Sequence, residues 1–161
     1  MKKIIVCLCC LFILTMLAQV GNAQASDLAL YQKLAEQGDA RAQYILGGLY
    51  YFGDGIPKDY TKAAYWFQKS AEQGDSSGQN ALGVMYYNGY GVTQDYVKAA
   101  HWYQKSADQG DANALYGLGR MYHAGTGVIR DRQRGCNLVR DAASQGHREA
   151  IDGYNRVCNT R

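Results

Sequence analysis

The chain has 161 residues, of which 47% are hydrophobic and 19% charged, values typical of a folded protein rather than of a disordered one. Its 17 basic and 14 acidic residues nearly balance, which argues against a general nucleic-acid-binding protein, because such a protein concentrates basic residues on one face. The balance shifts at the C-terminus, where residues 120–161 hold eight arginines and four acidic residues. This basic end is either a solvated cap or a contact for an acidic partner.

The first 25 residues have the layout of a secretory signal peptide, with Lys2 and Lys3 before an apolar run over 4–17. We expect residues 1–25 to be cleaved after Ala25, with cleavage after Ala23 as the near alternative. An uncleaved anchor is the rival interpretation, but a membrane span needs about 20 apolar residues. No later stretch approaches that length, so we expect no membrane span in the mature chain.

A period of 36 residues dominates the rest of the chain. The motif Ala-x-Gln-Gly-Asp begins at Ala35, Ala71 and Ala107, and a degraded copy begins at Ala143. Leu-Gly and Gly-x-Gly pairs recur at the same interval. A period between 20 and 50 residues is typical of stacked supersecondary units, which usually present extended binding surfaces.

Each repeat is predicted to contain two helices separated by a glycine loop. In the first repeat, Asp39 can cap a helix over 40–52, and Asp59 can cap a second helix over about 60–73. A glycine recurs inside the first helix of every repeat, at Gly47, Gly83 and Gly119, which indicates that another helix approaches closely there. We expect two tryptophans at matching positions of the second helices to be core residues, Trp66 and Trp102.

These repeats predict an all-α solenoid, an α/α superhelix of helix-loop-helix units. We expect one domain over residues 26–161, in which a helix over about 27–37 caps the front. The repeats cover about 35–70, 71–106 and 107–142, and a C-terminal capping helix follows in 143–161.

The mature chain keeps two cysteines, Cys136 on the second helix of the third repeat and Cys158 on the final helix. His147, in the turn between these helices, lies midway between them in sequence, so the cysteines should face each other across an antiparallel hairpin. We predict a disulfide, since the chain is exported, and about 3 kcal/mol of stabilisation from closing a loop of about 22 residues. The alternative is two buried free thiols.

Three positions of the first helix in each repeat project away from its core face. Tyrosine and arginine are favoured as interface anchors, so we predict that these positions form a groove for a protein or peptide partner. The alternative is that some members only fill gaps between adjacent helices. The strip also includes Gly48 and Val84, and its predicted partner-binding residues are Tyr44, Tyr51, Asn80, Tyr87, Tyr116, Arg120 and His123.

We find no catalytic or metal-binding pattern in the sequence. Neither Ser-x-x-Lys nor Lys-Thr-Gly occurs, and the histidines at His101, His123 and His147 are too dispersed for a recognisable zinc motif. The Gly-x-Gly loops follow helices rather than strands and never extend to G-x-G-x-x-G. We therefore expect no catalytic residue, no metal, no cofactor and no enzymatic activity.

Four recurring elements, A-x-Q-G-D, L-G-x-x-Y, G-x-G-[IV]-x-x-D and K-A-A-x-W, resemble the Sel1-like repeat family over residues 35–142. The third repeat departs from this pattern after Asp131 and looks like a closing cap. The resemblance, to relatives of the tetratricopeptide repeats, implies an α-solenoid whose first helices line a concave face.

The same resemblance implies a scaffold or adaptor of protein complexes. Exported bacterial members of the family are associated with envelope functions or host contact, which implies a periplasmic or secreted protein, most naturally of a Gram-negative bacterium. Some small cysteine-rich members have been described as binding or hydrolysing β-lactams. A hydrolase acting on β-lactams or the cell wall is therefore the alternative function.

Overall fold

The structure of the chain, a computed structural model, describes residues 28–158, so the expected signal peptide lies outside the described residues. After a helical segment over 28–36, the described part is entirely helical and contains no strand. None of its helices is both long and apolar enough to cross a membrane. The remaining helices are α2 (Ala40–Phe52), α3 (Tyr60–Glu72), α4 (Ser76–Asn88), α5 (Tyr96–Ala107), α6 (Ala112–Ala124), α7 (Arg132–Ser144) and α8 (Arg148–Cys158).

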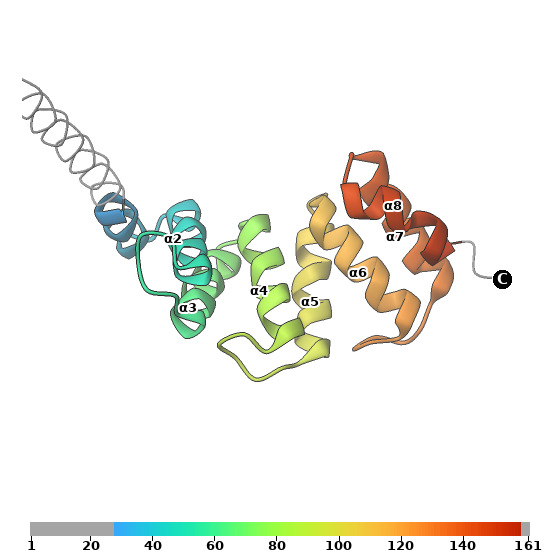
Figure 1. Cartoon of the computed structure of the whole chain (residues 1–161), viewed down its shortest axis with the longest axis horizontal. Helices are drawn as coiled ribbons and strands as arrows, with labels where there is room; N and C mark the ends of the chain where they lie inside the picture. The colour runs from blue at the N-terminus through green and yellow to red at the C-terminus, as the bar shows by residue number, and fades with distance from the viewer. Residues whose placement is uncertain (1–27, 159–161) are drawn as a thin grey trace, which may run out of the picture.

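The helices follow one another along the long axis of the molecule, from α2 near one end to α8 near the other (Figure 1). Each helix packs on its neighbours in sequence, and the even-numbered helices also approach one another within 8 Å between Cα atoms. In the described residues the odd-numbered helices α3, α5 and α7 make no such approach to one another. The even-numbered helices therefore line the inner, concave side, as the resemblance implied.

Aspartate caps fix the start of each helix from α2 to α7. Asp39, Asp75 and Asp111 cap the first helices of the repeats, and Asp59, Asp95 and Asp131 cap the second. Each carboxylate accepts a hydrogen bond from a backbone N–H three residues later, at 2.6–3.0 Å. These caps explain why the sequence predicts helix starts accurately.

The first helices end at glycines that adopt left-handed backbone conformations. Gly53, Gly89 and Gly125 have φ values of 76°, 72° and 78°, which residues with a Cβ atom rarely adopt. A second glycine two residues later lets the loop meet the preceding repeat, since a Cβ at Gly91 would overlap the backbone carbonyl of Tyr60. The same holds at Gly127 against Tyr96, whereas a Cβ at Gly55 in the first loop would meet nothing within 4 Å.

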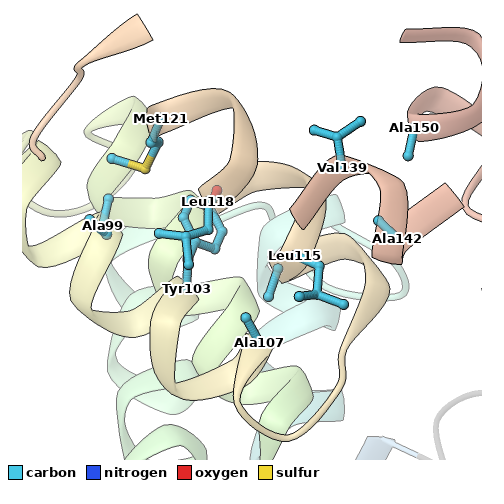
Figure 2. Close-up of a cluster of buried hydrophobic side chains, with 11 residues drawn as sticks. Ala99, Tyr103, Ala107, Leu115, Leu118, Met121, Val139, Ala142 and Ala150 are labelled. Atoms are coloured by element: carbon cyan, nitrogen blue, oxygen red, sulfur yellow. The ribbon is translucent and has the colours of Figure 1, made fainter. Parts of the chain in front are cut away.

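Small residues bring the two helices of a repeat together. A Cβ added at Gly47 would lie 2.6 Å from Cδ1 of Phe67, and one added at Gly83 would lie 2.7 Å from Cδ1 of Tyr103. The expected close approach at these glycines is therefore confirmed. Figure 2 shows the resulting core around α6, where Tyr103, Leu118 and other buried side chains from α5, α6 and α7 meet.

Two glutamine pairs, each with one buried member, link successive parts of the solenoid. Gln43 donates from Nε2 to the backbone carbonyl of Ala35 at 3.0 Å, and its Oε1 accepts a hydrogen bond from Gln73 at 2.7 Å. The same arrangement recurs one period later with Gln79 and Gln109. The recurring glutamine of the Ala-x-Gln-Gly-Asp motif thus satisfies the amide oxygen of a buried glutamine on the first helix that lies 30 residues earlier.

The tryptophans differ from the expectation. Trp66 and Trp102 are half-buried rather than fully buried, and each packs against the edge of a core cluster that includes the first helix of its own repeat. The fully buried position is one residue later, at Phe67 and Tyr103, because that side chain points directly at the glycine of the first helix.

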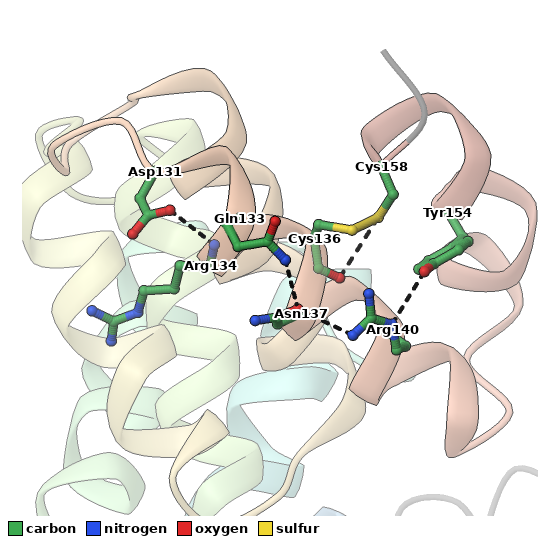
Figure 3. The surroundings of a disulfide bond; sticks show 8 residues. All are labelled: Asp131, Gln133, Arg134, Cys136, Asn137, Arg140, Tyr154 and Cys158. Carbon is green, nitrogen blue, oxygen red and sulfur yellow. Dashed lines mark hydrogen bonds between the residues drawn. A yellow bond between two sulfur atoms is a disulfide. The ribbon is translucent and has the colours of Figure 1, made fainter. Parts of the chain in front are cut away.

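The C-terminal hairpin is closed by the predicted disulfide. Cys136 on α7 and Cys158 on α8 are joined with an S–S distance of 2.09 Å and a Cα–Cα distance of 5.1 Å (Figure 3). Arg140 adds a second link between the helices, since its Nε donates to the Tyr154 hydroxyl at 3.1 Å. Within the described residues α8 packs on α7 and α6, with Ala150 buried in the shared core, and these two contacts add to that packing.

Candidate partner-binding groove

The predicted strip of nine positions lies on α2, α4 and α6, the helices that line the concave side. In the structure these nine positions fall into three groups: one at each of the two contacts, or junctions, between successive repeats, and one near the C-terminal hairpin. The first junction lies between the first and second repeats, over Phe67, and the second lies between the second and third repeats, over Tyr103.

The second junction contains a pocket of about 200 Å³, which we call the Arg120 pocket. It brings together Tyr87 and Arg120, two residues of the predicted strip that come from successive first helices. Asn88 and Val84 on α4, Gly117 on α6 and Tyr103 on α5 complete its lining.

Tyr103 forms the base of the Arg120 pocket. The residue is only 6% exposed, and burial, followed by the nearby Tyr87, raises the pKa of its hydroxyl well above the usual value, while Arg120 opposes this shift. The hydroxyl therefore stays protonated and can donate a hydrogen bond at neutral pH. Among the described residues it makes no side-chain hydrogen bond, so this donor is available to a ligand.

Gly117 keeps the pocket open. A Cβ at this position would lie 3.2 Å from Cζ of Tyr103 and would begin to cover the phenol ring. The matching positions of the earlier repeats hold Ile45 and Ala81. The sequence analysis missed Tyr103 and Gly117, although both depart from the repeat pattern: Tyr103 replaces Phe67, and Gly117 replaces a residue with a side chain.

The first junction is filled by aromatic packing. The ring of Tyr51 lies 5.3 Å from that of Tyr60 and 6.1 Å from that of Tyr90, while Tyr60 and Tyr90 stack at 4.8 Å. Burial, then the neighbouring Tyr60 and Tyr90, raises the pKa of the Tyr51 hydroxyl. The gap-filling alternative therefore describes Tyr51 better than a free partner contact does.

Tyr44 is likewise involved in packing. Its ring lies 5.8 Å from that of Phe67, and the Arg41 guanidinium lies 5.1 Å from the centre of the Tyr44 ring. Asn80, one period later, is half-buried on α4 and does not line the Arg120 pocket.

The remaining two strip residues lie towards the C-terminal hairpin. The ring of Tyr116 lies 4.8 Å from that of His147, the residue that caps α8, and the Arg120 guanidinium lies 5.7 Å from the Tyr116 ring. His123 is half-buried, and its Nδ1 has no hydrogen-bond partner among the described residues. Neither residue lines the Arg120 pocket.

A second, wider depression of about 780 Å³ lies at the loop between α6 and α7, in the arginine-rich part of the chain. Two of its arginines are already engaged: Arg130 donates to the backbone carbonyl of His123 at 3.0 Å, and Arg134 donates to Oε1 of Gln104 at 2.9 Å. The Arg134 guanidinium also lies 4.3 Å from the centre of the Tyr122 ring. The Arg134–Gln104 hydrogen bond links the third repeat to the second, while the other two contacts lie within the third repeat.

No cluster of three or more histidine, cysteine, aspartate or glutamate side chains in the described part of the chain could hold a metal ion. The candidate site is therefore the Arg120 pocket, with two aromatic rings, one guanidinium and one buried hydroxyl.

The chain belongs to the Sel1 repeat family, which matches residues 28–39, 40–75, 76–111 and 112–147. The family match divides the period five residues later than the division expected above, with the same 36-residue length. No curated protein matches the chain significantly.

Several solved structures are similar. A protective antigen of uropathogenic Escherichia coli strains, described as displaying an SLR fold, is 41% identical over 80% of this chain, with a TM-score of 0.73. A Sel1 repeat protein from Oxalobacter formigenes is 33% identical over 82% of the chain, with a TM-score of 0.75. The chain spans only 28% of the first protein and 54% of the second.

The Helicobacter pylori cysteine rich protein B is similar in size. It is 25% identical over 83% of this chain, with a TM-score of 0.63, and 96% of its own length is covered.

Proposed function

We propose that this Sel1 repeat protein is an exported scaffold or adaptor that binds a protein or peptide partner on its concave side and acts without catalysis. The observation that carries the proposal is the Arg120 pocket. Tyr87 and Arg120 come from successive repeats and meet over the buried Tyr103 hydroxyl, on the side lined by the first helices. Aromatic rings and a guanidinium around a partly buried pocket are the features of interface anchor sites.

Export to the periplasm or beyond it, in a Gram-negative bacterium, is the second part of the proposal. Three observations support it: the signal-peptide pattern of residues 1–25, the disulfide between Cys136 and Cys158, and the similarity to a protective antigen of uropathogenic Escherichia coli. Disulfides of this kind persist in oxidising compartments and are rare in the reducing cytosol.

The binding proposal is tested by replacing Tyr87 and Arg120 together with alanine. Partner capture by proximity crosslinking in the native cell should fall strongly, because both replaced side chains line the pocket. The variant should remain folded at the assay temperature, since Arg120 is exposed, but its melting temperature should fall somewhat because Tyr87 is half-buried and its ring lies 5.3 Å from that of Tyr96.

A matched control lies on α3, outside the groove. Tyr65 is 54% exposed, and the Lys69 ammonium lies 5.7 Å from its ring, so this pair has the same chemistry as the pocket residues. Replacing Tyr65 and Lys69 with alanine should leave capture unchanged. If capture survives the Tyr87 and Arg120 replacements, or falls equally with the control, the groove assignment is wrong.

The hydrolase alternative rests on the small cysteine-rich members of the family. A nitrocefin assay on the purified protein separates the two functions. We expect no turnover above the rate of the buffer alone, and hydrolysis that scales with protein concentration would contradict the binding-only proposal.

A further inference from the structure

The helices that line the concave side carry positive charge and no acidic residue within their spans; the nearest acids of their own segments are the capping residues Asp39, Asp75 and Asp111 at their N-terminal ends. The helices α2, α4 and α6 contain no aspartate and no glutamate, and their fully ionised side chains are Arg41 and Arg120. By contrast, α3 carries Lys62, Lys69 and Glu72 on the outer side. Beyond the capped starts of these helices a partner meets cationic and no anionic side chains from them, and this charge favours an acidic ligand.

The two arginines of this side differ in how far they are engaged. Each lies over a tyrosine ring, Arg41 over Tyr44 and Arg120 over Tyr116, but Arg41 also donates a hydrogen bond to the Ser77 hydroxyl at 3.3 Å. Arg120 is exposed, and within the described residues it has no carboxylate at ion-pair distance and donates no hydrogen bond to a side chain or carbonyl. Its donors are free for a ligand, and guanidinium donors match a carboxylate well because two parallel N–H groups can bind both oxygens.

The other polar groups of the pocket also suit an anionic acceptor. The Tyr103 hydroxyl is a protonated donor at the base, for the reasons given above. The Asn88 amide is held in place, because its Nδ2 donates to the backbone carbonyl of Val84 at 2.9 Å. No carboxylate lines the pocket to compete with an incoming one.

An apolar surface adjoins this polar pocket one repeat earlier. Shifting the pocket lining by 36 residues gives Gly48, Tyr51, Phe52, Phe67, Ala81 and Val84, none of which is charged. Phe52, which takes the place of Asn88, is 73% exposed, although large apolar side chains are normally buried. Val84 belongs to both sets, so the apolar surface and the Arg120 pocket are continuous.

We propose that the groove binds an acidic segment of a partner protein in an extended conformation, with an Asp or Glu side chain in the Arg120 pocket and an apolar side chain against Phe52 and Val84. This inference rests on the proposed function and names the partner chemistry of that same site. Arg120 supplies the positive charge, and the Tyr103 hydroxyl supplies a second hydrogen-bond donor. Phe52 provides the apolar contact for the residue beside the carboxylate.

The test is selection of binding peptides from a random library displayed on phage, with protein purified after expression of the full chain. The selected peptides should combine an acidic residue with a nearby apolar one, and their affinity should fall as ionic strength rises. Arg120→Ala should weaken the best peptide about 10- to 100-fold, as expected for loss of a charged hydrogen-bonded pair. Lys69→Ala, which removes a cation from the outer side, is the control and should change little.

Two further variants separate the pocket from general charge. Gly117→Ile introduces the residue of the matching position in the first repeat, Ile45, and should fill the pocket and abolish the preference for an acidic residue. Tyr103→Phe introduces the phenylalanine found at the matching position of the first repeat, Phe67, and removes only the hydroxyl donor. It should therefore weaken binding less than Arg120→Ala. Thermal unfolding of each variant shows whether the fold is intact.

Selected peptides without acidic residues, or equal affinity for the wild type and Arg120→Ala, would overturn the inference while leaving the proposed function intact. Failure of the wild type to bind any peptide would also overturn it. In that case the crosslinking experiment decides separately whether the concave side binds a folded protein.

Discussion

The glycines inside the first helices set how closely the two helices of a repeat approach. At Gly119 a Cβ would lie 2.8 Å from Cγ2 of Val139 and 2.9 Å from the backbone carbonyl of Gly135. At Gly48, in the equivalent kind of helix, a Cβ would meet nothing within 4 Å. Two glycines of the same secondary structure therefore have opposite consequences for packing.

We expect Gly119→Ala to destabilise the protein by roughly 1–3 kcal/mol, the usual cost of overpacking a tight contact. Gly48→Ala should instead stabilise it by up to about 1 kcal/mol, because alanine favours a helix interior over glycine. Urea unfolding followed by circular dichroism measures both free energies. Equal stability of Gly119→Ala and the wild type would show that the helices can separate without cost.

The helix cap at Asp95 gives a pH-dependent prediction. The backbone N–H of Lys98, which donates to Oδ1 at 3.0 Å, lowers the pKa of Asp95 below its ordinary value of 3.8, and the Lys98 charge adds to this. Because the pKa is lower in the folded state, the stabilisation is fully present above pH 3.8 and is lost as the pH falls through the folded-state value.

Asp95→Ala should therefore lower the melting temperature at pH 7, and the difference from the wild type should shrink at pH 2. Asp95→Asn, which caps without titrating, is the control: its melting temperature should differ from that of Asp95→Ala by a similar amount at both pH values, because neither variant titrates at this position. An alanine offset that is unchanged between pH 7 and pH 2 would contradict this assignment of the cap.

At the scale of elements, α8 depends on its links to α7. It packs on α7 and α6 but has no following repeat to cover its other side in the described residues. The disulfide joins residues 22 apart in sequence and pins this last helix. Earlier repeats hold Ala64 with Tyr86, and Ala100 with Tyr122, at the two matching positions.

Replacing both Cys136 and Cys158 with alanine should cost about 3 kcal/mol of stability on the loop-entropy estimate. We expect α8 to lose hydrogen-exchange protection before α4 and α5, because neighbouring repeats contribute stability locally. Reduction of the wild type should reproduce the behaviour of the double variant. If α8 stays as protected as α4 after reduction, the disulfide is not what holds it.

At the scale of the whole molecule, the sequence predicts the architecture well because every repeat contains the same local helix-start, turn and packing residues. Aspartate caps, left-handed glycines and a 36-residue period specify the helices of the described repeats, and the predicted end of α3 differs from the observed one by a single residue. The Cys136–Cys158 disulfide follows from the geometry of one hairpin, which is also local information.

The candidate site is less accessible to sequence reasoning. The predicted strip includes Tyr87 and Arg120, which line one pocket, but it groups them with Tyr51, whose ring packs near those of Tyr60 and Tyr90. It also missed Tyr103, because that residue reaches the groove from a second helix, between two first helices. The pocket is formed by side chains from three helices, and their meeting depends on how the repeats stack. The periodicity of one helix does not reveal which residues of other helices lie beside it.

The central claim is that the concave side, at the Arg120 pocket, is where a partner binds. The most direct test is a photo-crosslinking amino acid placed at Asn88, which lines the pocket and is exposed, and in a second strain at Tyr65 on α3. After irradiation of native cells, we predict that the Asn88 position captures a specific protein and that the Tyr65 position does not. Capture of the same protein only from Tyr65, or of nothing from Asn88, would contradict the account.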